Sequence, residues 1–193
     1  MGNVLIYVEA SDGKVAPVTY ELLGAARTLA AGLGGQVEAL LAGGGALASE
    51  LGGADTVIHV DHPSLSPYVP EAHVAVLAEA VRLRNPLVVL VGNTTIGIDL
   101  AAGAAAATGR PLVSYCVGLE AGGGAVVARS QLYGGKIIAH HADRFTGGVR
   151  GRRRIVPGRA WTVWRQGRAG DDGSPRLAGI AAQPIRRRHC TGW

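Results

Sequence analysis

The chain has 193 residues, two cysteines and a formal net charge of +5. This length suits one domain, and two cysteines exclude a disulfide framework or a four-cysteine metal site. No apolar run reaches the roughly 20 residues of a membrane span and no secretory leader is visible, so we expect a cytoplasmic protein without membrane insertion.

The first part of the chain predicts strands that alternate with helices. Short apolar runs indicate the strands, and apolar residues at helical spacing between proline and glycine boundaries indicate the helices. The predicted strands are 4–8, 37–42 and 56–60, and the predicted helices are 17–33, 46–51 and 69–84.

The stretch 87–118 has the clearest pattern. Two apolar runs, 87–91 and 112–117, flank an Ala-rich helix predicted over 96–108. Thr94 or Thr95 can cap this helix, and Gly109 fits its left-handed end. Strand, helix and strand in this order are typical of a parallel sheet covered on both faces. We therefore predict an α/β fold with a doubly wound, mostly parallel sheet.

The pattern changes after this stretch. Glycine-rich turns join runs 112–120, 125–132 and 136–139, which predicts a small antiparallel addition at one edge of the sheet. Residues 140–193 hold twelve arginines against three aspartates, whereas residues 1–139 hold seven basic and eleven acidic residues. We expect a domain over 1–139 and, over 140–193, an Arg/Gly-rich tail that is mostly disordered or frame-shifted, with one strand near 155–163.

The turn after 87–91 is the candidate ligand site. It places Gly92, Thr94, Thr95 and Asp99 at a strand's carboxyl end and a helix N-terminus, where open α/β sheets bind ligands and amide groups bind anions. Neither standard phosphate fingerprint is present. A capped helix, with Asp99 complementing the dipole in its first turn, explains the same residues, and we favour that interpretation.

Other chemistry has weaker support. His59 and His62 lack a third ligand at useful spacing, so we predict no metal site and no catalytic residues. The arginines of the tail, with Trp161, Trp164 and Trp193 near them, suit nucleic-acid binding by charge and stacking. We do not expect nucleic acid as a partner, because the preceding domain is acidic and has no nucleic-acid-binding motif.

Several segments, taken in order, resemble the N-terminal domain of the electron transfer flavoprotein α subunit. The resemblance covers about residues 3–139. Its motifs are the opening strand VLIYVE, Asp12-Gly13-Lys14, Gly53-Ala54-Asp55, GNTTIGIDLA from Gly92 to Ala101, the segment from Gly109 to Ser114, and Tyr133-Gly134-Gly135-Lys136.

This resemblance implies a Rossmann-like three-layer sandwich of the adenine nucleotide alpha-hydrolase type. It also implies an electron carrier that is not a stand-alone enzyme. As a heterodimer with the β subunit, such a protein holds FAD and passes electrons from flavin dehydrogenases to a quinone oxidoreductase or a related respiratory-chain acceptor. The family holds FAD mainly on a second, C-terminal α domain that nothing in this sequence matches. We therefore expect this chain to be a scaffold that does not bind FAD alone.

The composition after Ala139 is also what a reading-frame change in a GC-rich gene produces. We therefore interpret the chain as a truncated or frame-shifted α subunit that lacks the FAD-binding domain. Three alternatives stay open: a free-standing nucleotide-binding domain of universal-stress type that uses the turn from Gly92 to Asp99, a nucleic-acid-associated protein, and a non-functional truncated subunit.

Overall fold

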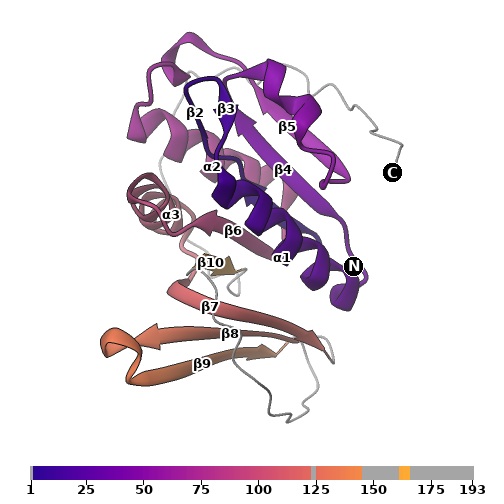
Figure 1. Ribbon diagram of the computed structural model, residues 1–193, viewed down its shortest axis with the longest axis vertical. Coiled ribbons are helices and arrows are strands. Elements are labelled where there is room, and N and C mark those ends of the chain that lie inside the picture. Colours follow the sequence, from indigo (N-terminus) through magenta and orange to yellow (C-terminus); the bar gives the residue numbers. More distant parts are fainter. Residues whose placement is uncertain (1, 123–124, 145–160, 166–193) are drawn as a thin grey trace.

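One sheet of eight strands runs through the part of the chain that the computed structural model describes, namely residues 2–122, 125–144 and 161–165. The strands of this sheet are β1 (Val4–Tyr7), β4 (Val37–Ala42), β5 (Thr56–Val60), β6 (Val88–Gly92), β7 (Leu112–Gly122), β8 (Ala125–Leu132), β9 (Ile137–Arg144) and β10 (Trp161–Arg165). They are ordered β5-β4-β1-β6-β10-β7-β8-β9 (Figure 1). A separate hairpin pairs β2 (Ala10–Ser11) with β3 (Lys14–Val15).

The first four strands in this order form a parallel sheet, and the other four pair antiparallel. The chain builds the parallel part outward from β1 through β4 to β5, and then returns to place β6 on the other side of β1. The strand order therefore reverses between β1 and β6. The predicted α/β fold, with a mostly parallel central sheet and an antiparallel addition, is confirmed.

Within the described ranges, three helices cover this sheet, and their ends follow from proline and left-handed residues. They are α1 (Pro17–Leu33), α2 (Pro70–Arg84) and α3 (Thr95–Thr108). Proline begins α1 and α2, where its missing amide costs no hydrogen bond, and left-handed Gly34 and Asn85 end them. None of the helices in the described ranges is long and apolar enough to cross a bilayer.

Three short 3-10 helices lie in the connections that the structure describes. They are η1 (Gly45–Glu50), η2 (Pro63–Leu65) and η3 (Tyr133–Gly135). The helix predicted over 46–51 is thus a 3-10 helix that begins one residue earlier. It follows the left-handed Gly44, which lets the chain turn sharply out of β4.

Alternate residues of the central strands build two cores, one on each face of the sheet. Val4 and Ile6 of β1 pack in the core that includes α1, and Leu5 and Tyr7 pack in the core that includes α2 and α3. Figure 1 shows α1 in front of the sheet and the other two helices behind it. The molecule is therefore a sandwich of helix, sheet and helix layers.

Strand β10 lies between β6 and β7, and this corrects one prediction. The stretch 87–118 predicts two strands of one parallel sheet around α3. Strands β6 and β7 do run in the same direction, but each pairs with β10, which is antiparallel to both. The local pattern specifies strands without specifying their neighbours, because pairing depends on segments far away in the sequence. The strand expected near 155–163 lies at Trp161–Arg165.

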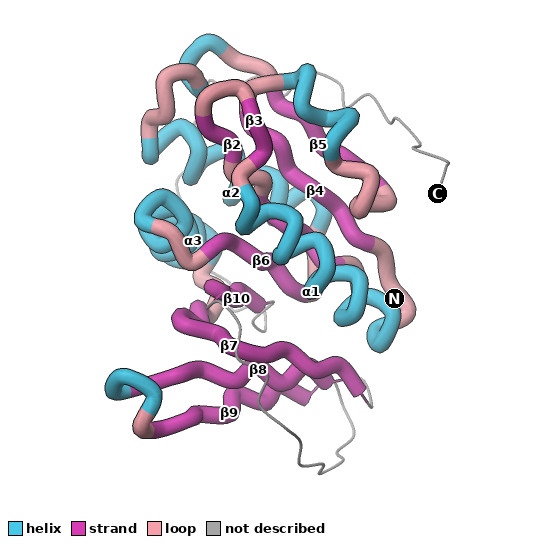
Figure 2. Tube along the Cα trace, viewed as in Figure 1, coloured by secondary structure: helices cyan, strands magenta, loops and turns pink. Residues whose placement is uncertain are grey.

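The antiparallel addition extends beyond the layer that the helices cover (Figure 2). It consists of β7, β8 and β9, with β9 at the edge of the sheet. The boundary expected at Ala139 falls inside β9, which continues to Arg144. Most of the segment 140–193 lies outside the described residues, so its interpretation as a disordered or frame-shifted tail stays a prediction.

Candidate functional site

The predicted candidate site lies where β6 ends and α3 begins. Thr94 is the N-cap residue: its backbone is extended, at φ −100° and ψ 171°, and its hydroxyl accepts a 2.9 Å hydrogen bond from the Gly97 amide. Of the two predicted caps, Thr94 is therefore the one used. At the other end of the helix, Gly109 adopts a left-handed backbone with φ 65°, as predicted.

Glu9 reaches this turn from the end of β1. Its Oε2 accepts a 2.8 Å hydrogen bond from the Thr94 hydroxyl, and the residue is only 8 % exposed. Thr19 fixes the backbone of Glu9, because its Oγ1 accepts from the Glu9 amide (3.0 Å) and donates to the Glu9 carbonyl (3.2 Å). Burial raises the pKa of the Glu9 carboxyl, and the hydrogen bond from Thr94 opposes that shift.

Two glycines make room for this carboxyl group. A Cβ atom added to Gly92 would lie 2.5 Å from Oε1 of Glu9, and one added to Gly97 would lie 2.9 Å from the same oxygen. Oε1 is buried and has no hydrogen-bond partner among the described residues. The Glu9 carboxyl group therefore lies directly against the end of β6 and the first turn of α3.

The other predicted site residues lie away from this centre. Thr95 and Asp99 are both exposed on α3. The prediction that Asp99 lies in the first turn is wrong, because α3 begins at Thr95 and Asp99 is its fifth residue. The structure thus brings Gly92 and Thr94 together with Glu9, and leaves Thr95 and Asp99 on the surface.

A buried aromatic group lies at the same edge of the sheet. Tyr7 and His73 are 3 % and 5 % exposed, and the Tyr7 hydroxyl lies 2.5 Å from Nδ1 of His73. Nε2 of His73 lies 3.2 Å from the carbonyl of Leu65, which can only accept, so Nε2 carries the proton and Nδ1 accepts from Tyr7. Burial lowers the pKa of His73, which favours this neutral form. The ring of Tyr68 packs on His73 at a centroid distance of 4.6 Å.

This aromatic group and Glu9 were not predicted as site residues. Tyr7 and His73 belong to no motif, and their contact joins β1 to α2 across 66 positions of sequence. Glu9 carried a usable signal, because it is an acidic residue two positions after the end of a strand that is buried throughout. Such a position lies at the carboxyl edge of a parallel sheet.

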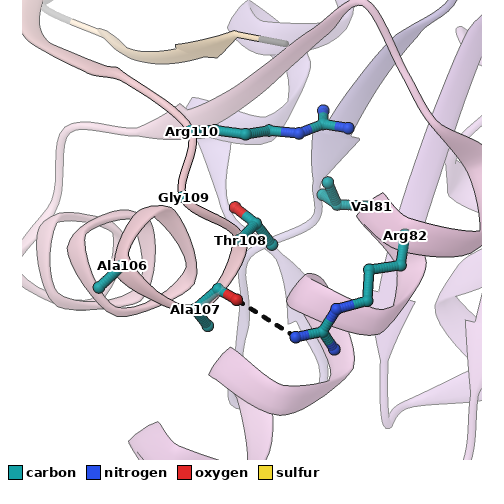
Figure 3. Close-up of a pocket in the computed structure, with 7 residues that line it drawn as sticks. All are labelled: Val81, Arg82, Ala106, Ala107, Thr108, Gly109 and Arg110. Atoms are coloured by element: carbon teal, nitrogen blue, oxygen red, sulfur yellow. Dashed lines mark hydrogen bonds between the residues drawn. The ribbon is translucent and has the colours of Figure 1, made fainter. Parts of the chain in front are cut away.

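The opposite edge of the sheet has a small cavity of about 180 Å³ between the ends of α2 and α3 (Figure 3). Arg82 and Arg110 line it. Arg82 donates to the carbonyl of Ala107 (3.2 Å), and Arg110 donates to the carbonyl of Pro86 (3.1 Å) and to Oδ1 of Asn85 (3.1 Å). These contacts satisfy carbonyl groups near helix ends, and the cavity is smaller than the roughly 300 Å³ at which cofactor pockets begin.

No group of three or more His, Cys, Asp or Glu side chains in the described ranges is placed to hold a metal ion. Cys116 is buried and forms no disulfide. Burial raises the pKa of its thiol, which disfavours the reactive thiolate. Cys116 is therefore a core residue, as expected.

Comparison with known proteins assigns the chain to a family. A family model described as an electron transfer flavoprotein domain matches residues 4–143. The chain is 35 % identical over 142 residues to electron transfer flavoprotein subunit alpha of Thermoanaerobacterium thermosaccharolyticum, an alignment that covers 71 % of this chain and 43 % of that protein. It is 31 % identical over 144 residues to protein FixB of Azorhizobium caulinodans, covering 70 % of this chain and 39 % of FixB.

A third relative comes from an enzyme complex. The chain is 38 % identical over 122 residues to the lactate dehydrogenase (NAD(+),ferredoxin) subunit LctC of Acetobacterium woodii, covering 61 % of this chain and 29 % of LctC. The chain thus spans between 29 % and 43 % of the length of these three relatives. The family match begins at the first residue of β1 and ends one residue before the end of β9, and so contains all described elements except β10 and the last residue of β9. The chain belongs to the electron transfer flavoprotein family.

Proposed function

We propose that this chain is the N-terminal scaffold domain of an electron transfer flavoprotein α subunit. In this role it works as a heterodimer with the β subunit, and the complex carries electrons from flavin dehydrogenases to a quinone oxidoreductase or another respiratory-chain acceptor. The observation that carries the proposal is the family match over residues 4–143 together with the alignment to an α subunit. The names of the relatives, which are subunits of larger assemblies, support the need for a partner.

The described residues do not fit FAD at the usual place for a dinucleotide. That place is the crevice at the carboxyl edge of the sheet, where the pyrophosphate lies on a helix N-terminus. Here Glu9 fills the space at the N-terminus of α3, and its carboxyl group lies against Gly92 and Gly97. We therefore propose that FAD, the cofactor of the intact complex, is held by residues other than these.

We propose an electron carrier rather than an enzyme, and the support is His73, whose ring is held by hydrogen bonds within the fold. His73 binds Leu65 through one ring nitrogen and Tyr7 through the other, and both ring side chains are buried. A histidine that acts as a general base needs a ring nitrogen within reach of a substrate proton. Neither nitrogen of His73 meets that condition.

The same geometry counts against the universal-stress type of nucleotide-binding domain, because that function needs the N-terminus of α3 to be open to phosphate.

We also propose a cytoplasmic location. Its support is Cys116, which is buried and unpaired, as thiols are in a reducing compartment.

Co-purification with a β subunit tests this proposal. The full chain, carrying an affinity tag, is co-expressed with the β subunit encoded in the same genome, and the eluate is analysed by size-exclusion chromatography. We expect a complex with one copy of each chain. A second sample, in which the β subunit of an unrelated species replaces the cognate one, controls for non-specific capture. Separate elution of the chain and its cognate β subunit would contradict the proposal.

A further inference from the structure

The N-terminus of α3 lies at the one place in the parallel sheet where the strand order reverses. Chain connections lead from β1 to β4 on one side, and β6 pairs with β1 on the other. Open α/β sheets bind ligands in the crevice at this point, outside the carboxyl ends of the strands. A helix of 14 residues that begins there presents amide groups and the positive end of its dipole. These features attract an anion, and phosphate is the anion such sites usually hold.

In this chain the Glu9 carboxyl group fills the space beside the N-terminus of α3. Glu9 is 8 % exposed. A Cβ atom added to Gly92 would lie 2.5 Å from Oε1 of Glu9, and one added to Gly97 would lie 2.9 Å from it. Oε1 has no hydrogen-bond partner among the described residues. A buried carboxyl oxygen without a partner is unusual, since buried polar atoms are nearly always hydrogen-bonded. Oε1 lies in the space that side chains at Gly92 and Gly97 would otherwise occupy, beside the first turn of α3.

Thr94 couples the carboxyl group to the helix. Its hydroxyl accepts from the Gly97 amide at 2.9 Å and donates to Oε2 of Glu9 at 2.8 Å. Both functions of the hydroxyl, as acceptor and as donor, are therefore in use. A phosphate group that approached this turn would have to displace the Glu9 carboxyl or lie beside it, and two anions in one partly buried site repel each other.

We propose that Glu9 is a built-in occupant of the anion position at the N-terminus of α3, and that it makes the domain reject phosphate groups, including those of adenine nucleotides. Glu9 is thus a specificity-determining residue: the fold keeps the geometry of a nucleotide-binding site and closes it with one side chain. This inference goes beyond the proposed subunit role, because it holds for the chain with or without a β subunit.

The test measures phosphate binding to the full chain and to its Glu9→Ala variant. Inorganic phosphate and AMP are the probes, and the readout is the amide chemical shift of Gly97. We expect no saturable shift in the native chain at millimolar phosphate. Glu9→Ala opens the space and removes the competing carboxyl group, so we expect a saturable shift at Gly97 and an affinity at least about tenfold higher than that of the native chain.

Glu71→Ala is the matched control, because it removes an exposed acidic residue from the first turn of α2 and leaves the α3 site filled. It is expected to behave like the native chain. Glu9→Ser, which opens the same space and keeps a hydroxyl near Thr94, replaces Glu9→Ala if that variant does not fold. Saturable phosphate binding at Gly97 of the native chain would overturn the proposal, and so would a folded Glu9→Ala or Glu9→Ser variant that gains no binding.

Discussion

The hydroxyl of Thr94 donates a 2.8 Å hydrogen bond to Oε2 of Glu9, a residue that lies 85 positions earlier in the chain. The bond joins the end of β1 to the start of α3 across the point where the strand order reverses. Because the same hydroxyl caps α3 through the Gly97 amide, the strand end and the helix N-terminus form one unit. Four predictions test this arrangement and the packing around it.

Replacing Thr94 by valine removes the helix cap and leaves the buried Glu9 carboxyl without its donor. Loss of an N-cap typically costs about 1 kcal/mol, and an unsatisfied buried polar group costs a further 1 to 3 kcal/mol or so. We therefore expect Thr94→Val to lower the free energy of unfolding by about 2 to 4 kcal/mol. Urea denaturation followed by circular dichroism measures this loss. Thr95→Val, at an exposed position next to the cap, is the control, and an equal loss in both variants would contradict the assigned roles.

A Gly97→Ala substitution tests how closely Glu9 and β6 approach the helix. Alanine in place of glycine usually stabilises a helix by about 1 kcal/mol. At Gly97 the new methyl group would meet the carbonyl oxygen of Gly92 and would lie 2.9 Å from Oε1 of Glu9. We therefore expect a loss of about 2 kcal/mol, the usual scale of overpacking.

Gly24→Ala in α1 is the matched control for that substitution. A Cβ atom at Gly24 has no other atom within 4 Å, and Gly24 is exposed in the middle of the helix. This variant is expected to gain about 0.5 to 1 kcal/mol of stability. If Gly97→Ala stabilises the protein as much as Gly24→Ala does, Glu9 and β6 do not lie against Gly97.

Glu38 and Arg84 form a partly buried ion pair at the amino edge of the sheet. The Arg84 guanidinium donates to both carboxyl oxygens, at 2.6 and 2.9 Å, and the Glu38 side chain is 1 % exposed. Asn3 donates a third hydrogen bond, at 3.1 Å. Arg84→Met would leave this carboxylate buried without its cation, and we expect a loss of about 3 kcal/mol in urea denaturation.

The double variant Glu38→Leu/Arg84→Met distinguishes the effect of an unpaired Glu38 charge from the effect of losing the packing contacts of the Arg84 side chain. Because it removes the buried charge as well, it should be less destabilised than Arg84→Met alone. Glu79→Gln, which breaks the exposed pair of Glu79 with Arg82, should cost less than about 0.5 kcal/mol. If the double variant is as unstable as Arg84→Met, the uncompensated charge at Glu38 is not the cause.

His73 makes the stability of the domain depend on pH. Burial lowers the pKa of His73 below its ordinary value of 6.5, so the unfolded chain binds a proton more readily than the folded one. The stability that neutral His73 contributes is present above pH 6.5 and is lost as the pH falls through the folded-state pKa. Burial raises the pKa of Glu9, which acts in the opposite direction: its contribution is lost as the pH rises through the folded-state pKa.

Comparison of the native protein with His73→Gln isolates the histidine, because both proteins keep Glu9. We expect the stability difference between them to become smaller as the pH is lowered from 7.5 to 5. Urea denaturation at a series of pH values measures it, with exposed His62→Gln as the control. A difference that does not change with pH would show that His73 does not gain a proton on unfolding.

Local signals were sufficient to predict most of the fold. The apolar runs 4–8 and 87–91 predicted two of the parallel strands, and Pro17 and Gly109 marked helix ends. These signals depend on a residue's own conformation and on near neighbours. The position of β10 between β6 and β7 has no such signal, since it depends on pairing with strands far away in the sequence.

The candidate site was predicted only in part for the same reason. Thr94 was predicted as a possible cap because capping involves residues three positions apart. The contact of Thr94 with Glu9 and that of Tyr7 with His73 join residues 85 and 66 positions apart, and one sequence does not show which distant residues meet. The position of Glu9 after β1 indicated the correct edge of the sheet, but not the helix that its carboxyl group touches.

Flavin binding by the purified full chain tests the central claim, that this domain is a scaffold whose described residues do not hold FAD. The chain is purified without a β subunit, its visible absorption spectrum is recorded, and the fluorescence of added FAD is followed as protein is titrated in. We predict a colourless protein that leaves the fluorescence unchanged. A yellow protein, or saturable quenching with one FAD per chain, would contradict the account.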